Sequence, residues 1–142
     1  MLYLGHVISA VNMSLDPSML RVLADWQLPT IVRELQLLLG FVNFYGDFIE
    51  GQTAHTTSLY YMTAARKGIE QVHFWADDVE RFKKIKRRPC AAPWLAHPNL
   101  EAPFTLYTDT TKIAVNAVLL QRDAKCVNRA ISFFSKNSHS LR

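Results

Sequence analysis

The spacing of apolar positions changes twice along this chain, from a strand-like run to a helical stretch and back to strands. Residues 2–9 (LYLGHVIS) combine apolar, aromatic and β-branched side chains in a run that is short for a helix, and they predict a strand. Gly5 within this run indicates a bulge or a close backbone approach, and Asn12 is expected in the turn that follows. After this turn the apolar spacing becomes helical.

Two helices are predicted next, separated by Leu28-Pro29. Asp16-Pro17 is a favourable helix start, because the carboxylate can accept hydrogen bonds from free amides and proline suits the first position. Thr30 is expected to cap the second helix. Apolar side chains recur every three or four residues, first at Met19, Val22, Leu23 and Trp26 and then at Leu35, Leu38, Leu39, Val42, Tyr45 and Ile49. These patterns predict helices over 16–27 and 30–49, with Gly40 marking a kink or a close packing point.

The second half begins with two further helices and then changes to strands. A weak helical pattern covers 53–66, and a charged helix over 77–88 has an apolar face of Val79, Phe82 and Ile85. Prolines 89, 93 and 98 predict an extended connector without helix. Three strand-like runs follow, FTLYT, IAVNAVLLQ and VNRAISFF, which begin at Phe104, Ile113 and Val127. The turn at 122–125 joins the last two runs, so the fold class is α+β.

Composition restricts the class of protein. With 142 residues, 49% of them apolar and 20% charged, the chain is typical of one globular domain or two very small ones. The two cysteines, Cys90 and Cys126, are too few for a disulfide framework or a thiolate metal site, which favours a reducing compartment. The apolar runs fall short of the roughly 20 residues of a membrane span, and no basic residue precedes Arg21 as a signal peptide requires. We therefore expect an intracellular protein, cytoplasmic or nuclear.

Charge is distributed unevenly. Residues 1–65 carry two basic and five acidic side chains, a net of −3, whereas residues 66–142 carry fourteen basic and seven acidic ones, a net of +7. The densest basic run consists of Arg81, Lys83, Lys84, Lys86, Arg87 and Arg88. Such a run can contact nucleic-acid phosphates. The alternative is a solvated helix face, since cations near a helix C-terminus are also favourable against its dipole.

The order and the amino-acid sequences of these segments resemble the pol polyprotein of gypsy-type long-terminal-repeat retrotransposons, over nearly the whole chain. YLGHVIS at Tyr3–Ser9 is similar to the primer-grip segment of the reverse transcriptase, and Leu15–Ile49 is similar to its thumb. His73–Pro98 resembles the connection, because it contains a tryptophan, a charged helix and the sequence APWL. FTLYTDTTKIAVNAVLLQ at Phe104–Gln121 resembles the first two strands of the RNase H domain, and AISFFSKNSHSL resembles its third strand and the segment after it.

This resemblance implies a division of the chain and a set of nucleic-acid contacts. Residues 1–70 would form the primer-grip strand and thumb-like helices, 71–102 the connection helix and proline-containing connector, and 103–142 a truncated three-stranded antiparallel RNase H-like meander. The expected partner is an RNA–DNA hybrid or template–primer, bound weakly. The residues expected to contact it are Leu4, Gly5, His6, Lys83, Lys84, Lys86, Arg87 and Arg88.

The resemblance also places Asp109 on the first carboxylate of the RNase H domain, which implies a ligand for Mg²⁺ in two-metal cleavage of RNA. The alternative is that Asp109 caps a turn with Thr110 and Thr111. The remaining carboxylates of the family come from segments after the third strand, and this sequence stops at Arg142. We therefore expect an incomplete Mg²⁺ site without tightly bound metal and a chain that is inactive alone. Asp77-Asp78 superficially resembles a polymerase aspartate pair, but a charged helix follows instead of an apolar strand, and acidic residues in a first helical turn complement the dipole.

Several positions depart from the family pattern. Gly46 and Asp47 stand where the family usually has arginine, which predicts weaker phosphate binding by the thumb. Asn116 replaces a usual glycine and is expected to crowd the sheet.

Trp26 and Trp75 are expected as core anchors. The histidines at 55, 73, 97 and 139 show no ligand spacing and are expected on the surface or in loops.

Two other functions remain open from the sequence. One is a non-enzymatic, domesticated or remnant protein that acts by protein–protein interaction, with a longer pol protein or with itself through an exposed strand edge. Three strands without covering helices leave a bare apolar face, and the helical half is the expected cover. The other is a helix-turn-helix DNA-binding protein, but the second predicted helix offers only Arg33 near its start for base readout.

Overall fold

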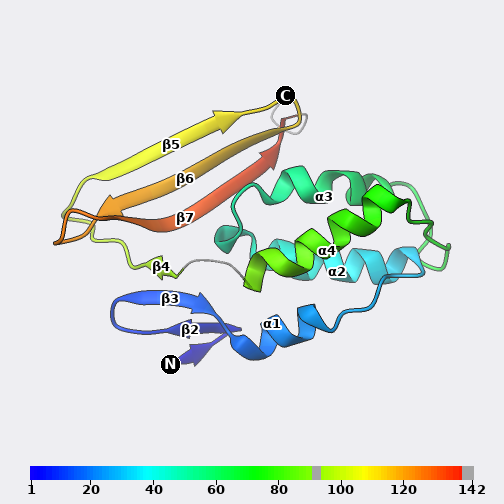
Figure 1. The fold of residues 1–142 in the computed structure, drawn as a ribbon, viewed down its shortest axis with the longest axis horizontal. Helices are drawn as coiled ribbons and strands as arrows, with labels where there is room; N and C mark the ends of the chain where they lie inside the picture. Colours follow the sequence, from blue (N-terminus) through cyan, green and yellow to red (C-terminus); the bar gives the residue numbers. More distant parts are fainter. Residues whose placement is uncertain (91–93, 139–142) are drawn as a thin grey trace.

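In the computed structural model, which describes residues 1–90 and 94–138, helices lie beside two antiparallel sheets (Figure 1). The first sheet holds, in spatial order, β1 (Leu2–Tyr3), β2 (His6–Ile8), β3 (Asn12–Leu15) and β4 (Leu95–Ala96). The helices are α1 (Pro17–Ala24), α2 (Val32–Phe44), the short 3-10 helix η1 (Gly46–Phe48), α3 (Gln52–Tyr61) and α4 (Ala76–Cys90). The second sheet is the meander β5 (Phe104–Thr110), β6 (Ala114–Arg122) and β7 (Asn128–Asn137). The predicted α+β class and three-stranded antiparallel meander are confirmed.

The predicted strand over 2–9 is instead a hairpin. Leu4 and Gly5 form its two-residue turn with φ angles of 48° and 78°, the left-handed backbone that tight hairpins favour. A Cβ on Gly5 would collide with the phenol of Tyr45, so the predicted close approach is real. Asn12 begins strand β3 rather than lying in the turn, and the predicted connector supplies β4, which pairs with β3. Strand β3, which pairs with the hairpin strand β2, is therefore also bound to a segment that follows it by about eighty residues.

The first two helices start near their predicted positions but end earlier. The Asp16 carboxylate accepts a hydrogen bond from the Ser18 amide at 3.0 Å, so the predicted cap of α1 is confirmed. Helix α2 has Ile31 at its N-cap, and Glu34 reaches back to accept from the Thr30 amide at 2.8 Å. The prediction that Thr30 caps this helix was therefore wrong by one residue. A Cβ on Gly40 would meet no atom within 4 Å, so Gly40 is not a close packing point.

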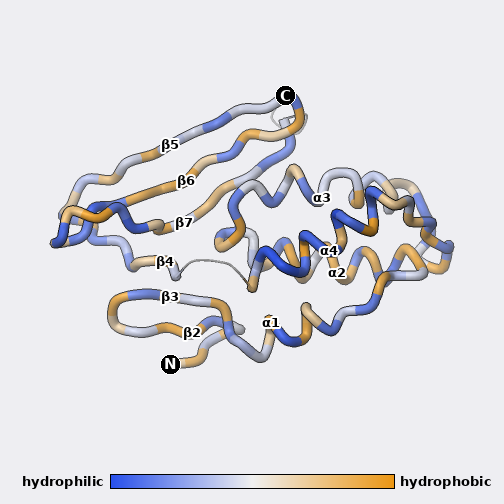
Figure 2. The backbone as a smooth tube through the Cα atoms, viewed as in Figure 1, coloured by the Kyte–Doolittle hydropathy of each residue, from blue (hydrophilic) through white to orange (hydrophobic). Residues whose placement is uncertain are grey.

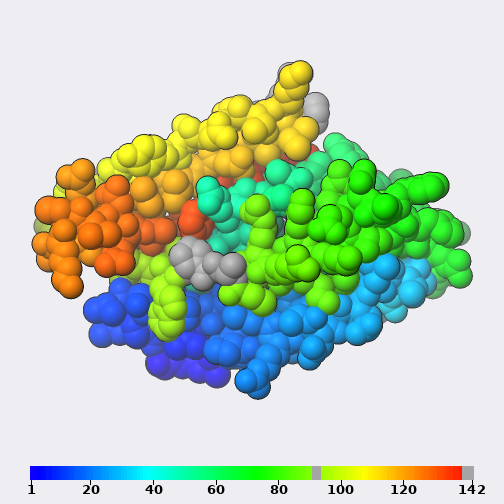
Figure 3. All heavy atoms as spheres, in the orientation of Figure 1, coloured from blue at the N-terminus to red at the C-terminus, as the bar shows by residue number. Residues whose placement is uncertain are grey.

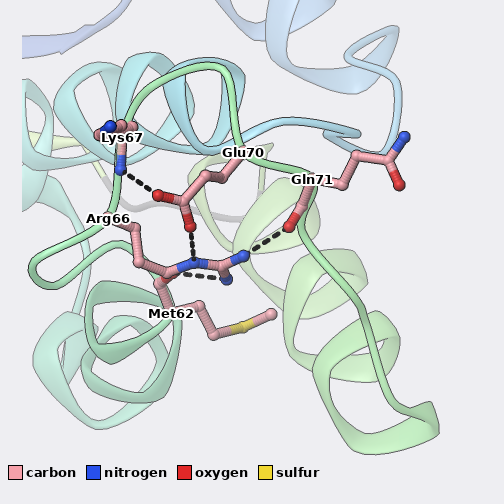
Figure 4. A network of polar contacts seen from close by, with 5 residues as sticks. All are labelled: Met62, Arg66, Lys67, Glu70 and Gln71. Carbon is pink, nitrogen blue, oxygen red and sulfur yellow. Dashed lines mark hydrogen bonds and ion pairs between the residues drawn. The ribbon is translucent and has the colours of Figure 1, made fainter.

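Helix α3 ends at Tyr61, earlier than predicted, because the chain after it folds into a polar loop (Figure 4). Ala65 adopts a left-handed φ of 55°, which is typical of a helix end. The Arg66 guanidinium pairs with Glu70 at 3.1 Å and donates to the Gln71 carbonyl oxygen at 2.6 Å, while the Lys67 amide donates to Glu70 at 2.8 Å. Arg66 also donates to the Met62 carbonyl oxygen at 3.3 Å, one of the carbonyl groups that the end of a helix leaves free.

Helix α4 is longer than predicted and includes Pro89. Because proline has no amide hydrogen, the last turn of α4 lacks the hydrogen bond that residue 89 would otherwise donate to the Ile85 carbonyl oxygen. Residues 91–93, with Pro93 of the predicted connector, lie outside the described residues, as does His139.

The main hydrophobic core belongs to the helices. Val32, Leu35 and Leu38 of α2 have no exposed surface, and they pack with apolar side chains of the other helices and of the loop before α4. The buried members of this core are Leu23, Val32, Leu35, Leu38, Leu39, Val42, Ile49, Leu59, Val72, Phe82 and Ile85. Trp26 is partly buried against it, but Trp75 is 78% exposed, so the predicted core role of Trp75 was wrong.

A second core joins the meander to the rest of the molecule. It consists of Leu15, Tyr45, Phe48, Leu95 and Phe133, which come from both sheets and from the segment around η1. Strand β7 packs against η1, α3 and β4. On the face seen in Figure 3, atoms of the segment that leads into α3 fill the space between the meander and α4. The helical half therefore covers one face of the meander, as expected from the sequence.

Candidate nucleic-acid interface

The hairpin that carries the first predicted contacts is anchored to the helical unit. The His6 ring stacks on Phe48 with ring centroids 5.2 Å apart and lies 5.6 Å from the ring of Tyr45. The Gly5 carbonyl oxygen accepts a hydrogen bond from the Asp16 amide at 2.9 Å. Leu4 at the tip is exposed. Among the three predicted residues, Leu4 thus has the most accessible side chain, while His6 is half-buried between aromatic rings.

The basic run lies on α4, and its cations fall on two flanks of the helix. The stripe of Phe82, Ile85 and Pro89 is buried, and hydrophilic turns alternate with hydrophobic positions along the helix (Figure 2). Because an apolar stripe about 100° wide separates the flanks, cations at neighbouring sequence positions point to different sides. The sequence predicted the stripe but treated the cations as one run.

The flank facing α1 carries Lys83, Lys86 and Arg87, which line a hollow of about 390 Å³ together with Ala24 and Cys90. The Lys86 ammonium donates to the carbonyl oxygen of Trp26 at 2.8 Å and lies 5.2 Å from the centroid of the Phe82 ring. Lys86 therefore joins α4 to the end of α1, and this structural contact occupies one of its three donors.

The flank facing α3 carries Arg81, Lys84 and Arg88, opposite His55. Burial lowers the pKa of His55, and the positive charges of Arg88, Lys84 and Arg81 lower it further. Arg88 donates a hydrogen bond to the carbonyl oxygen of Glu50, just before α3. His55 was expected on the surface or in a loop, because no local pattern indicates that α3 packs beside these cations.

Asp77-Asp78 form the first turn of α4, as the sequence predicted. The Asp78 carboxylate accepts from the Trp75 amide at 3.1 Å and pairs with Arg81 at 3.3 Å. The Asp78 carboxylate therefore has a structural role: it accepts from a free amide and lies at the positive end of the helix dipole.

Asp109 lies within β5, directly opposite Asn116 of β6. The nearby turn is closed by Thr111, which bonds to Ala114, so the alternative interpretation of Asp109 as a turn cap was wrong. Asp109 lines a hollow of about 160 Å³ that also includes Glu50 and Asn116. No group of three or more His, Cys, Asp or Glu side chains suited to a metal ion is present among residues 1–90 and 94–138. The described residues therefore do not fit a two-metal centre.

The side chain of Asn116 is accommodated without crowding the sheet, contrary to expectation. Its oxygen accepts from the Ser135 hydroxyl at 2.8 Å, and the Ser135 oxygen in turn accepts from the Thr53 amide at 3.0 Å. This chain of hydrogen bonds connects β6 and β7 to the first turn of α3. It satisfies one of the amides that a helix start leaves free.

The two positions that depart from the thumb pattern face the meander. Gly46 and Asp47 line a hollow of about 550 Å³ between α3 and β7. A Cβ on Gly46 would come too close to the side-chain oxygen of Gln52. Position 46 therefore packs too closely against Gln52 for a residue with a side chain, such as the arginine of the family pattern.

Residues 75–141 match the family model described as "RNase H-like domain found in reverse transcriptase". Over these residues the chain is similar to that family. No helix in the described part of the chain has the length and apolar character needed to span a membrane.

The full-length relatives are Pol polyproteins of transposons and retroviruses. The chain is 28% identical over 143 residues to the Pol polyprotein from transposon opus of Drosophila melanogaster, and the match covers 95% of this chain and 14% of the relative. It is 30% identical over 141 residues to the Gag-Pol polyprotein of walleye dermal sarcoma virus, covering 98% of this chain and 8% of that protein. The chain is therefore similar to part of these Pol polyproteins, and it spans about a seventh or less of their length.

Solved structures confirm the fold. The foamy viral protease-reverse transcriptase in complex with double-stranded DNA superposes with a TM-score of 0.83 at 17% identity, over 100% of this chain and 29% of that chain. The same enzyme in complex with an RNA/DNA hybrid gives a TM-score of 0.82 at 18% identity, over 96% of this chain and 18% of that chain.

Proposed function

We propose that this chain is the thumb, connection and first RNase H-like strands of a gypsy-type retrotransposon reverse transcriptase, and that it contacts template–primer. The corresponding division is 1–70, 71–102 and 103–142. The contacts are the hairpin residues Leu4, Gly5 and His6 and the cations Lys83, Lys84, Lys86, Arg87 and Arg88. The observation that carries the proposal is α4, whose buried stripe fixes the helix while cations flank it on both sides.

The proposed activity of this 142-residue chain by itself is binding without cleavage. Asp109 contributes one carboxylate, whereas two-metal cleavage places several carboxylates around the ions. We expect that Mg²⁺, the metal that the resemblance implies, is not held tightly by the described residues. The proposed setting is intracellular, where an RNA–DNA hybrid would be available.

The test is a titration of a fluorescently labelled RNA–DNA hybrid with the purified chain in Mg²⁺, at about 50 mM and about 200 mM salt, followed by gel analysis. We expect binding that weakens steeply with salt, since phosphate contacts release counterions. We also expect an intact hybrid. Asp109→Asn is the matched control: cleavage by the unaltered chain that this variant abolishes would contradict the proposed inactivity. Absence of binding at the lower salt would contradict the contact function.

A second candidate function, self-association or docking on a longer pol protein, is favoured by the outer face of the meander. Strand β5 is exposed along its whole length and forms an edge of the sheet. Leu106 is 62% exposed and Phe134 is 51% exposed. An exposed edge beside apolar side chains promotes association. Sedimentation at increasing concentration tests this candidate: a single monomeric species throughout argues against self-association, and Leu106→Lys should shift any oligomer toward monomer.

A further inference from the structure

We infer that the two cationic flanks of α4 are not equivalent: Arg81, Lys84 and Arg88, together with His55 of α3, form the main site for nucleic-acid phosphates. The flank facing α1, with Lys83, Lys86 and Arg87, contributes general attraction only. This inference rests on the proposed function and specifies where contact occurs. Three cations are present on each flank, so the distinction lies in their placement. The flank of Arg81, Lys84 and Arg88 is called the α3-side row below.

Positive charge converges on one point of the α3-side row. The charges of Arg88, Lys84 and Arg81 all act on the imidazole of His55, which is half-buried, and together with burial they lower its pKa. A neutral imidazole keeps one N–H donor. A phosphate at this position would accept hydrogen bonds from the surrounding donors and would also relieve the repulsion among the cations.

The side chains of this row are partly held in place before any ligand binds. Arg88 donates to the Glu50 carbonyl oxygen, a neutral acceptor that fixes the guanidinium and leaves its charge uncompensated. Arg81 is paired with Asp78 and is therefore the weakest contributor. Lys84 is exposed and makes no hydrogen bond or ion pair with any of the described residues. A fixed guanidinium loses less conformational entropy on binding phosphate than a free one.

The flank facing α1 is organised for packing. Lys86 donates to the Trp26 carbonyl oxygen and lies over the Phe82 ring, so one of its three N–H donors is already used. Lys83 and Arg87 border a hollow whose other walls are Ala24 and Cys90, which offer no strong donor to a phosphate. This flank therefore provides Lys83 and Arg87, but the residue of α1 that lines the hollow, Ala24, offers no side-chain donor to complete a phosphate site.

The α3-side row also lies toward the strand that carries Asp109. Helix α3 contacts both α4 and β7, and in Figure 1 it runs between α4 and the meander. Glu50, whose carbonyl oxygen holds Arg88, lines the same hollow as Asp109. A phosphate backbone bound along this row is thus directed toward the meander and away from α1.

Adjacent lysines provide a matched test. Lys84→Gln removes one exposed charge from the α3-side row, and Lys83→Gln removes one exposed charge from the other flank of the same helix. With the labelled RNA–DNA hybrid, we expect Lys84→Gln to weaken binding roughly fivefold and to reduce the slope of log K against log salt by about one. Lys83→Gln should stay within about 1.5-fold of the unaltered chain, since general attraction alone is reduced. Circular dichroism checks that both variants are folded.

The outcomes separate the inference from the proposed function. Equal losses in the two variants, or a larger loss in Lys83→Gln, overturn the inference while leaving nucleic-acid contact intact. Failure of the unaltered chain to bind overturns the proposed function and the inference with it.

A second readout is the NMR titration of the His55 ring, assigned with His55→Gln. Saturating hybrid should raise the His55 pKa because a phosphate stabilises the imidazolium. An unchanged His55 pKa in the bound state contradicts the placement.

Discussion

The helical unit and the meander bury their apolar side chains very differently. In the helical unit, α2 lies at the centre of a core to which the other three α-helices also contribute, and Val32, Leu35 and Leu38 are fully buried. In the meander, one face packs on η1, α3 and β4, and every residue of β5 is exposed. The helical core includes no residue of the meander, whereas the covered face of the meander depends on Tyr45 and Phe48.

This difference implies a one-way dependence. A sheet with one bare face is marginal by itself, so the meander needs the helical unit, while the helical unit can retain its core without the meander. For function, the consequence is that the basic helix α4 is part of the more stable region, and the strand carrying Asp109 is part of the less stable one. Local stability thus differs between the two proposed sites.

The largest expected effect separates the two regions directly. Leu38→Ala removes a fully buried side chain from the helical core and should lower the free energy of unfolding by about 2–5 kcal/mol. Leu106→Ala makes the same chemical change on the open face of the meander and should change it by less than about 0.5 kcal/mol. Urea unfolding followed by circular dichroism measures both. Similar losses would show that the open face is covered in solution.

Phe133→Ala breaks the connection between the regions. Phe133 is 9% exposed and packs in the second core, so its truncation should cost about 3 kcal/mol. The loss should be local: amide hydrogen exchange should accelerate in β5, β6 and β7 while α2 remains protected. Phe134→Ala on the exposed face is the control and should change exchange little. Equal acceleration in α2 and the strands after Phe133→Ala would contradict one-way dependence.

Gly5 and Gly40 have opposite surroundings, so alanine at the two positions should change stability in opposite directions, by a smaller amount than the core substitutions. Gly5→Ala should destabilise the chain by about 1–3 kcal/mol, because the left-handed backbone disfavours a side chain and the new methyl meets Tyr45. Gly40→Ala lies in an exposed part of α2 with free space around it, and it should stabilise by about 0.5–1 kcal/mol. Thermal unfolding compares the two. A neutral Gly5→Ala would show that the hairpin moves freely from Tyr45.

Much of the helical unit was predictable because its signals are local. Asp16-Pro17 marks a cap, and the three-to-four-residue apolar spacing identifies the faces of α2 and α4. The ends were less predictable, since α2 stops at Phe44 although Tyr45 and Ile49 continue its apolar pattern. Both residues lie beyond the end of the helix, but their side chains are buried. The apolar pattern therefore indicates which residues are buried and not where the helix ends.

The remaining features depend on contacts between distant segments. The pairing of β4 with β3 involves a two-residue strand that no local pattern reveals. The turn at Leu4 was missed because leucine rarely adopts a positive φ. For the candidate site, the sequence identified the cations of α4 and their apolar stripe. Which flank faces His55 follows from the packing of α3 on α4, which single-sequence periodicity does not determine.

The smallest predicted effect is a dependence on pH in the turn between β6 and β7. Hydrogen bonds from the Val127 amide, from Arg129 and from the Lys125 amide lower the pKa of Asp123. Since the folded pKa lies below the unfolded value of about 3.9, the contribution of Asp123 is fully present above that value and disappears as pH falls through the folded pKa. Thermal unfolding between about pH 6 and pH 2 should therefore decline less steeply in Asp123→Asn than in the unaltered chain. Identical declines would mean that this hairpin is already open at the unfolding midpoint, which would place the meander even further below the helical unit in stability.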